Sequence, residues 1–363
     1  MTNLNYLSLF LATTVFVVNN AGPTILHGNA SYYGASTPKI PGRSKLFVDL
    51  KNDRGKVLAK SSSNAKKFPI KFQLKYSADK LDKNSNYSLT ASIKSANKKL
   101  LYANNVDMPL ILYGNSKTTH VHVQMVDSVP SYAKYRKGVI HNINDLKVYD
   151  VGQNSSSSSM AVIILYDALG FNIEQTRMFA ERLAAETNAR VLMPDFFRGN
   201  ALPYSALHPY QPKVVTTWIE KSPSWTMIEK ELKMLSKELR ASGKIKKLAV
   251  IGFCWGGFHV VKACSEPQLV DSGISIHGSM LNMTNPNQIQ KPIMFLKGNN
   301  DPSLNEIKAV LDKKPFGSKC EYKNYENMAH GFVTAKANFH SKENVEAIDD
   351  VHQKCIKFLK NTT

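Results

Sequence analysis

The chain has 363 residues, which gives room for two domains that each bury a core of their own. Its formal net charge of +19 raises the question of a nucleic-acid partner, but no recognition motif accompanies the charge. All four cysteines follow residue 253, so we expect neither a small disulfide-dense scaffold nor a lipid-modified N-terminal cysteine.

The first patterned segment is Leu7–Val18, a run of twelve residues that is almost entirely apolar. This length is too short for a membrane-spanning helix and is typical of the apolar core of a signal peptide. The alternative is an apolar N-terminal strand, because no Lys or Arg precedes the run. We expect a signal peptide at residues 1–21, a linker at residues 22–39, a secreted protein and no stable membrane insertion. Glycosylation on that route is permitted by sequons at Asn29, Asn86, Asn154, Asn282 and Asn361.

The positive charge is concentrated in the N-terminal part of the chain. Residues 1–137 carry 20 Lys and Arg against 6 Asp and Glu, whereas the remainder carries 27 against 22. The lysines are scattered along strand-like segments, which favours a solvated lysine face that keeps sheet edges apart. We therefore expect no nucleic-acid partner, and contact between this basic part and an anionic surface remains an open alternative.

Residues 40–127 alternate apolar and polar side chains in short runs that turn clusters separate. The clearest runs are Leu46–Leu50, Ile70–Tyr76, Tyr87–Ile93 and Val121–Met125. A period of two predicts strands with one buried face. We expect a small all-β sandwich or barrel.

This stretch resembles the YbaY-type domain that is shared with the pilotin-like lipoproteins of type III secretion. The resemblance rests on three blocks, at residues 46–50, 76–93 and 100–112. We find no grouping of acid, base and nucleophile in this stretch. The expected role is therefore that of a non-catalytic accessory domain.

After a predicted linker at residues 128–137, the pattern changes to alternating strands and helices. Strands are predicted at residues 145–151, 161–166, 191–194, 248–253, 274–277, 293–297 and 321–325. Helices are predicted at residues 174–187 (with Asn172 as its cap), 225–240 and 344–360. Such alternation specifies a mostly parallel, doubly wound sheet with helices on both faces. Residues 138–363 are thus expected to form an α/β domain.

The most informative stretch surrounds Cys254. The buried-type strand 248–253 leads at once into Cys254, then into Gly256 and Gly257 and a helix-like segment. Strand, glycine turn and helix are typical of a nucleophile elbow, G-x-S-x-G, with Cys254 in place of the serine. A lone cysteine in an apolar stretch is more often a small buried side chain. A dinucleotide loop is disfavoured because G-x-G-x-x-G is absent. The assignment therefore depends on an acid and a histidine further along.

Both partners follow in the required order. Asp301 lies in the loop after the strand 293–297, and His330 lies after the strand 321–325. The order nucleophile, acid, histidine is that of the α/β-hydrolase fold. In such a triad the histidine takes the thiol proton and the carboxylate orients the histidine. We predict this fold and a free thiol at Cys254, and we expect Cys355 to lie in the core on a final helix.

Residues 138–360 resemble the dienelactone hydrolase (carboxymethylenebutenolidase-like) family. The matching blocks are residues 161–170, 193–199, 252–257, 300–301 and 330–332. The resemblance implies Cys254 as nucleophile, His330 as base and Asp301 as the residue that orients the base. It also implies an oxyanion hole made by the backbone N–H groups of Ala168 and Trp255.

Three positions depart from that family or match it only nearly. Asp167 stands where relatives that open dienelactone carry a glutamate that assists thiol activation. Arg198 is a near match, offset by about one place, for an arginine that binds a substrate carboxylate. A second arginine is absent, because Thr334 occupies its place and Lys336 is the nearest cation. The resemblance thus implies Asp167 and Arg198 as substrate-binding residues without naming the substrate.

We therefore predict a hydrolase of small carboxylic esters or lactones that works through an acyl-enzyme on Cys254. The expected partner is the small-molecule substrate, and we expect neither a cofactor nor a metal. Two alternatives remain open. The protein could bind a surface through its basic β-domain with a vestigial hydrolase domain, or the same triad could transfer the acyl group to an acceptor. The complete triad favours hydrolysis over the binding role.

Overall fold

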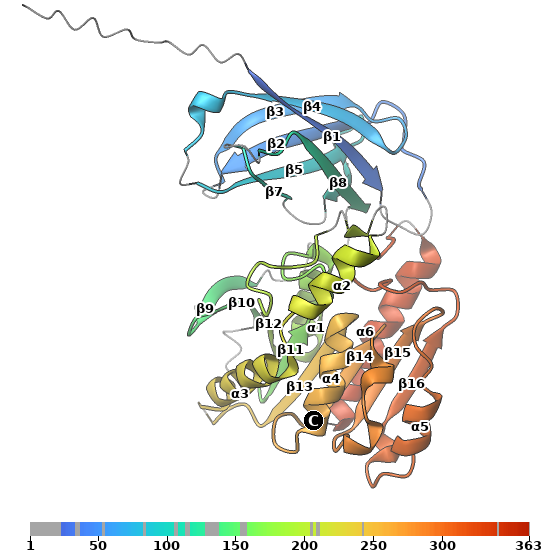
Figure 1. The fold of residues 1–363 in the computed structure, drawn as a ribbon. Helices are drawn as coiled ribbons and strands as arrows, with labels where there is room; N and C mark the ends of the chain where they lie inside the picture. The colour runs from blue at the N-terminus through green and yellow to red at the C-terminus, as the bar shows by residue number, and fades with distance from the viewer. Residues whose placement is uncertain are drawn as a thin grey trace, which may run out of the picture.

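The structure, a computed structural model, is drawn as a ribbon in Figure 1. It describes residues 23–32, 37–52, 55–82, 85–104, 108–112, 117–127, 138–152, 158–203, 206–207, 211–241, 243–339 and 341–362. The predicted signal peptide, the predicted linker at 128–137 and the sequon at Asn154 lie outside these ranges.

The N-terminal part of the chain forms one curved, eight-stranded sheet with the order β3-β2-β5-β6-β8-β1-β4, and β7 pairs with β5. The strands are β1 (Thr24–Tyr32), β2 (Lys45–Asn52), β3 (Val57–Asn64), β4 (Ile70–Tyr76), β5 (Tyr87–Lys94), β6 (Leu100–Asn104), β7 (Met108–Leu110) and β8 (His120–Asp127). The Ser61 hydroxyl on β3 donates to the Gln73 carbonyl on β4 at 2.6 Å, so the two ends of the strand order meet. The prediction of a small all-β domain is confirmed, and this closure favours the barrel over the sandwich of the two predicted forms.

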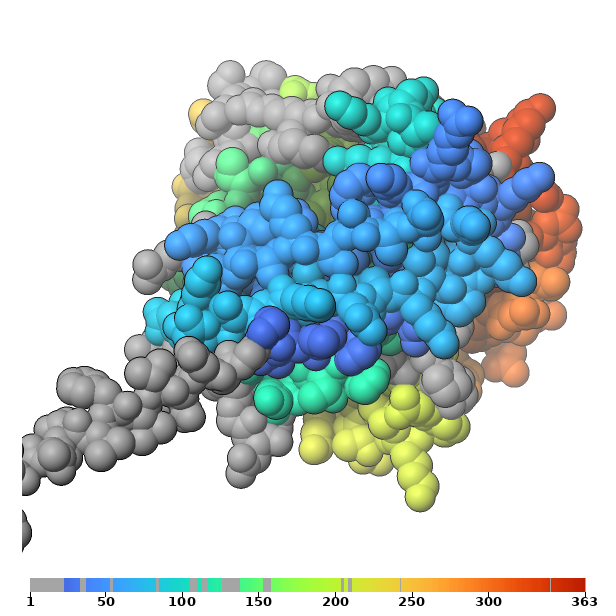
Figure 2. Space-filling view, turned by 90° about the horizontal axis from the view of Figure 1, so that it is seen from above, coloured from blue at the N-terminus to red at the C-terminus, as the bar shows by residue number. Residues whose placement is uncertain are grey.

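One face of this sheet is apolar and buried, and the other face is mainly polar and exposed. On β4 the side chains of Ile70, Phe72 and Leu74 are buried in a shared apolar core, whereas the alternate residues Lys71 and Lys75 are exposed. The period of two therefore places the apolar side chains inside and the lysines outside, as the sequence pattern predicts. Seen from above in Figure 2, this sheet, coloured blue, covers the middle of the visible face.

The prediction of a linker at residues 22–39 is wrong for β1. This strand lies inside the sheet, antiparallel to β4 and parallel to β8. Its inward residues are Leu26, Gly28 and Ala30. A Cβ on Gly28 would come within 2.3 Å of the Phe72 ring, so the small residue admits the large one. Because two of three inward side chains are small, the strand carries little hydrophobic signal.

The C-terminal part forms a second eight-stranded sheet with the order β16-β15-β14-β13-β11-β12-β10-β9. The strands are β9 (Val139–Ile143), β10 (Leu146–Val151), β11 (Met160–Leu165), β12 (Arg190–Pro194), β13 (Lys247–Phe253), β14 (Ser272–Ile276), β15 (Ile293–Gly298) and β16 (Glu321–Tyr325). All pairs from β12 to β16 are parallel, and β10 pairs antiparallel with both β9 and β12. This strand order, with its intervening helices, is the predicted α/β-hydrolase fold.

Helices cover both faces of the second sheet (Figure 1). They are α1 (Glu174–Thr187), α2 (Pro212–Lys221), α3 (Trp225–Ala241), α4 (Trp255–Ser265), α5 (Asn305–Leu311) and α6 (Lys342–Thr362). On β13, Phe253 packs against Phe179 of α1, whereas a Cβ on the neighbouring Gly252 would meet Val260 of α4. Neighbouring strand residues point to opposite faces, so α1 and α4 lie on opposite sides. This double cover explains why β13 is buried from Leu248 onward.

Two details of the helices differ from the sequence-based expectation. The cap of α1 is Ile173, with no side-chain hydrogen bond, because Asn172 Oδ1 instead accepts from Arg177 Nη2 at 2.8 Å. The short helices α2 and α5 were not predicted, and none of the residues of α2 is buried. Across the described part of the chain, every helix is too short or too polar to span a membrane.

Candidate active site

Cys254 sits on the sharp turn between β13 and α4. Its backbone has φ 51° and ψ −112°, a region that non-glycine residues rarely adopt and that is common at functional sites. The turn is tight because its neighbours lack side chains. A Cβ on Gly256 would lie 2.0 Å from the Leu165 carbonyl oxygen, and one on Gly252 would lie 2.2 Å from the Gly256 carbonyl oxygen. The glycines thus permit the close approach that turns the thiol toward the cavity.

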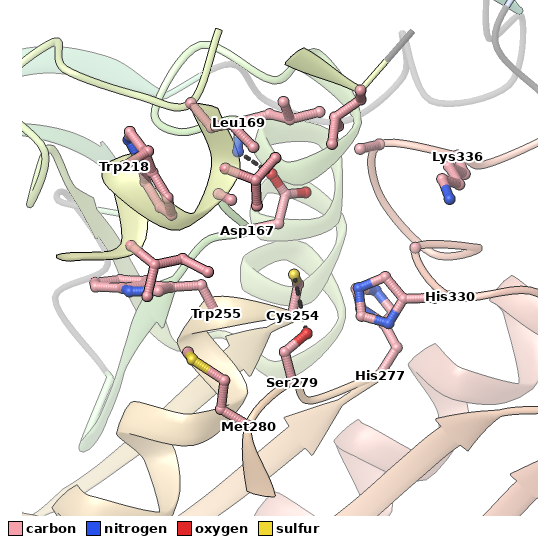
Figure 3. A pocket seen from close by; sticks show the side chains of 17 residues that line it. Asp167, Leu169, Trp218, Cys254, Trp255, His277, Ser279, Met280, His330 and Lys336 are labelled. Carbon is pink, nitrogen blue, oxygen red and sulfur yellow. Dashed lines mark hydrogen bonds between the residues drawn. The ribbon is translucent and has the colours of Figure 1, made fainter. Parts of the chain in front are cut away.

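The fold brings the three predicted triad residues together. His330 Nδ1 lies 2.5 Å from Asp301 Oδ1. The Cys254 side chain lies beside the His330 ring (Figure 3), and the two side chains form a hydrogen bond. Asp301 Oδ2 accepts a hydrogen bond from the Gly298 N–H at 2.6 Å, which fixes the carboxylate at the end of β15. A thiol, an imidazole and a carboxylate therefore form one row at the carboxyl edge of the sheet.

The charges in this row stabilise one another. Burial by itself would raise the pKa of Cys254, but the charge and hydrogen bond of His330 outweigh burial and lower the pKa of the thiol. Burial would likewise lower the pKa of His330, yet Cys254 and Asp301 raise it to about 10. The His330 imidazolium also outweighs the burial of Asp301, so the pKa of that carboxyl is lowered. The arrangement favours a thiolate next to an imidazolium.

The two backbone groups predicted for the oxyanion hole both line the cavity beside Cys254. Trp255 is the first residue of α4, so its N–H has no acceptor within the helix. In the described ranges no backbone acceptor is recorded for the Ala168 N–H either. Both groups are thus able to donate to an oxygen that enters from the cavity.

Asp167 also lines the cavity, but its carboxylate is held by the protein. Oδ1 accepts from the Leu169 N–H at 2.9 Å, and Oδ2 accepts from the Thr334 hydroxyl at 3.1 Å. The side chain is buried, and burial raises the pKa of this carboxyl. Thr334, which replaces an arginine of the family pattern, therefore serves as a partner of Asp167.

The structure does not bring Arg198 to this cavity. Its guanidinium forms ion pairs with Asp145, at 2.9 Å, and with Glu231, at 2.5 Å. Arg198 instead lines a separate surface hollow together with residues of α2. The backbone of Arg198 has a positive φ of 48°.

Several residues of the site were missed by sequence reasoning. The Ser279 hydroxyl lies 3.4 Å from the Cys254 sulfur, and the buried His277 ring packs edge-on against His330 at 5.1 Å between centroids. Both residues follow β14, the strand next to β13. Because parallel strands end at the same edge, the motif His277-Gly-Ser279 at the end of the predicted strand 274–277 was a signal that could have identified them.

The triad opens into a cavity of about 240 Å³. Figure 3 shows Cys254 and His330 at its base, with Asp167 and Trp218 across from them. Its walls are mainly apolar and include Leu169, Leu202, Val215, Trp218, Trp255 and Met280. Helix α2 supplies Val215, Trp218 and Ile219, so the unpredicted helix forms one wall of the site.

The other cysteines differ from Cys254 in environment. All four thiols are unpaired, and Cys264 and Cys355 are buried in the core. Burial raises the pKa of Cys264, Cys320 and Cys355. No group of three or more metal-ligating side chains occurs among the described residues.

The strand order and the elbow define an α/β hydrolase. Comparison with protein families makes the assignment specific: residues 146–363 match the dienelactone hydrolase family, to which the chain belongs. It is therefore a hydrolase enzyme. Residues 39–123 match a second family, the type III secretion system lipoprotein chaperone YscW.

The chain is also similar to individual proteins and solved structures. A carboxymethylenebutenolidase homolog from Xenopus tropicalis is 27% identical over 231 residues, which cover 61% of this chain and 90% of that protein. A dienelactone hydrolase-like promiscuous phosphotriesterase from metagenomic libraries is 18% identical and covers 61% of this chain and 98% of its own, with a TM-score of 0.42. An alternative pilotin from the type II secretion system of Vibrio cholerae is 20% identical and covers 30% of this chain and 99% of its own, with a TM-score of 0.27.

Proposed function

We propose that this hydrolase cleaves small carboxylic esters or lactones through an acyl-enzyme on Cys254. The observation that carries the proposal is the row formed by Cys254, His330 and Asp301, in which the thiol pKa is lowered and the imidazole pKa is raised. The family membership and the apolar cavity in front of the thiol support the same chemistry.

The first half of the reaction forms the acyl-enzyme. The Cys254 thiolate attacks the carbonyl carbon, and the electron pair of the C=O bond moves to the oxygen. The N–H groups of Trp255 and Ala168 donate to this oxyanion. As the C–O bond to the alcohol breaks, the His330 imidazolium gives its proton to the leaving oxygen.

The second half regenerates the thiolate. Neutral His330 takes a proton from a water molecule, whose oxygen attacks the thioester carbon. The C–S bond then breaks, the acid product leaves, and Cys254 returns to the thiolate beside the imidazolium. Asp301 keeps Nδ1 of His330 facing away from the thiol throughout, because it accepts the hydrogen bond from that nitrogen.

Replacement of the nucleophile tests the proposal. For Cys254→Ala we expect turnover of a panel of 4-nitrophenyl esters to fall by about 10³-fold or more, and the acyl adduct to vanish from the intact-mass spectrum. Cys320→Ala is the matched control, because that thiol is also unpaired and partly exposed but lies outside the cavity. If Cys254→Ala turned over the panel at the wild-type rate, the proposal would be wrong.

We also propose that the protein is exported and that its N-terminal sheet is an accessory domain. The support is the predicted leader at residues 1–21 and the match of residues 39–123 to a secretion-system chaperone family. Expression of the whole chain with sequencing of the mature N-terminus is the test. Export predicts loss of the leader and a new N-terminus, whereas an intact Met1 in a protein retained by the cell would contradict it.

A further inference from the structure

The walls of the active-site cavity are built from apolar side chains on helix α2 and on several other segments of the chain. Leu169 follows β11, Leu202 lies in the segment before α2, Trp255 opens α4 and Met280 follows β14. An apolar wall with few polar groups favours an apolar ligand, because each buried methylene is worth about 0.8 kcal/mol. The volume of about 240 Å³ lies below the roughly 300–1,000 Å³ of sites for drug-sized ligands.

Helix α2 forms the most distinctive wall. The Trp218 indole N–H donates to the Asn200 carbonyl at 3.0 Å, and its ring packs edge-on against Phe197 at 5.1 Å between centroids. Phe197 in turn packs against Trp255 at 4.7 Å, next to the nucleophile. Trp218 is therefore held in place by the protein, and the aromatic wall is pre-formed rather than assembled by a ligand.

The charges around the cavity do not attract an anion. Among the described residues that line it, Lys336 is the only Lys or Arg, and Asp167 faces the same space. The triad adds the thiolate and the Asp301 carboxylate against one imidazolium. The strongly basic Arg198 is kept outside by its two acidic partners. A carboxylate that entered would lose its hydration and would meet Lys336 as the only lysine or arginine among the described lining residues, with Asp167 on the same cavity.

We propose that the substrate is an uncharged ester or lactone and that the part of it that enters this cavity is a short alkyl or aryl group. Substrates that carry a free carboxylate on that part are disfavoured. The proposal rests on the hydrolase function proposed above. The wall of α2, in particular Trp218 and Ile219, selects for the apolar group. Lys336 offers the main competing interpretation, in which it would bind an anionic end of the substrate.

Two esters of equal acyl length test the charge preference. In 4-nitrophenyl hexanoate the chain ends in a methyl group, and in mono-4-nitrophenyl adipate it ends in a carboxylate. We expect wild-type kcat/KM to be at least about tenfold higher for the hexanoate, since the carboxylate must be desolvated. From acetate through butyrate to hexanoate, kcat/KM should rise about fourfold per methylene group until the cavity is filled.

A matched pair of substitutions on α2 tests the location. Ile219 lines the cavity and is 42% exposed, whereas Val214 on the same helix is 38% exposed and lies outside the cavity. Ile219→Arg should reduce the preference for the hexanoate by about tenfold or more, because the guanidinium can reach a carboxylate in the cavity. Val214→Arg adds the same charge to the same helix and should leave the preference unchanged.

The outcomes separate this proposal from the proposed function. If the adipate monoester were the better substrate and Lys336→Ala abolished that advantage, the substrate would be anionic and this inference would be wrong. An equal change in the preference for the hexanoate in Ile219→Arg and Val214→Arg would also overturn it, because the added charge would then act at long range and not inside the cavity. In both cases an acyl adduct on Cys254, measured by intact-mass spectrometry, would still support the proposed hydrolase function. Absence of any acyl adduct with either ester would contradict the function itself.

Discussion

The two sheets of this protein differ in where their polar side chains can meet. In the N-terminal sheet, buried and more exposed residues alternate along strands such as β2 and β4, so polar side chains are spread over the outer face. In the C-terminal sheet, β13 is buried on both faces, and the side chains of the candidate site collect where the parallel strands end. Cys254, His277 and Asp301 follow β13, β14 and β15 in this way.

The difference shows why only one sheet concentrates reactive groups. Parallel strands start on one side and end on the other, so the loops at their carboxyl ends converge on one edge. A mainly antiparallel sheet sends consecutive strand ends to opposite sides and has no such edge. Lys71 and Lys75 therefore contribute charge to a surface, whereas Cys254 and His330 contribute to a site. Four experiments test this contrast.

Loss of the base should have the largest effect. His330→Ala removes the imidazolium that lowers the thiol pKa and the acid that protonates the leaving group. We expect kcat for a 4-nitrophenyl ester to fall by about 10²- to 10⁴-fold. The thermal unfolding of the N-terminal sheet should not change, because His330 lies at the carboxyl edge of the C-terminal sheet and is not part of the N-terminal apolar core. Retention of more than a tenth of wild-type kcat would remove His330 from the triad.

A core truncation in the N-terminal sheet should affect stability without affecting chemistry. Leu46 is fully buried in the apolar core of that sheet, so Leu46→Ala should cost about 2–5 kcal/mol of its unfolding free energy. Urea unfolding followed by circular dichroism measures the loss. Ester turnover, assayed below the unfolding transition, should equal that of the wild type. A parallel fall in turnover would mean that the two parts of the chain are not energetically independent.

The pH dependence should report the two coupled groups of the site. Activity needs the thiolate and the imidazolium together. The rate kcat/KM should therefore fall about tenfold per pH unit below the lowered pKa of Cys254, and fall again above the raised pKa of His330, about 10. Alkylation by iodoacetamide measures the thiolate directly. In His330→Ala its midpoint should move up toward the ordinary thiol value of about 8.5. An unmoved midpoint would exclude the imidazolium as its cause.

Removal of one surface charge should have the smallest effect. Lys71 is exposed on β4, so Lys71→Gln should change the unfolding free energy by no more than about 0.5 kcal/mol and leave turnover unchanged. Gln73, two residues along the strand, shows that a neutral polar residue suits this face. A larger loss, again by urea unfolding, would show that Lys71 has a structural role that its exposure does not reveal.

Strong periodicity made most of the fold predictable. The helix at Glu174–Thr187 has its predicted bounds, and β4 and β16 match their predicted ranges. Segments with weak signals were missed. Strand β1 turns the small residues Gly28 and Ala30 inward, so it carries little apolar signal. Helix α2 has apolar residues at helical spacing (Val214, Val215, Trp218 and Ile219), but it is only ten residues long and none of them is buried.

The site residues were predictable where their order along the chain specifies their position. They were unpredictable where contacts between residues distant in the sequence determine the direction of a side chain. Cys254, Asp301 and His330 follow strands that end at one edge, so order alone brought them together. The direction of Arg198 depends on Asp145 and Glu231, which are far away in the sequence. The same holds for Thr334, whose hydroxyl meets Asp167 across 167 positions of the chain.

The unequal environments of the four thiols determine how the protein responds to oxidants. Peroxide reacts with thiolates, so Cys254 is the side chain that should form a sulfenic acid first, while the other three stay reduced. No second cysteine lines the cavity among the residues described, so such damage would not be trapped there as an internal disulfide. A small external thiol could then restore the enzyme, which makes its activity a reversible reporter of the redox conditions around it.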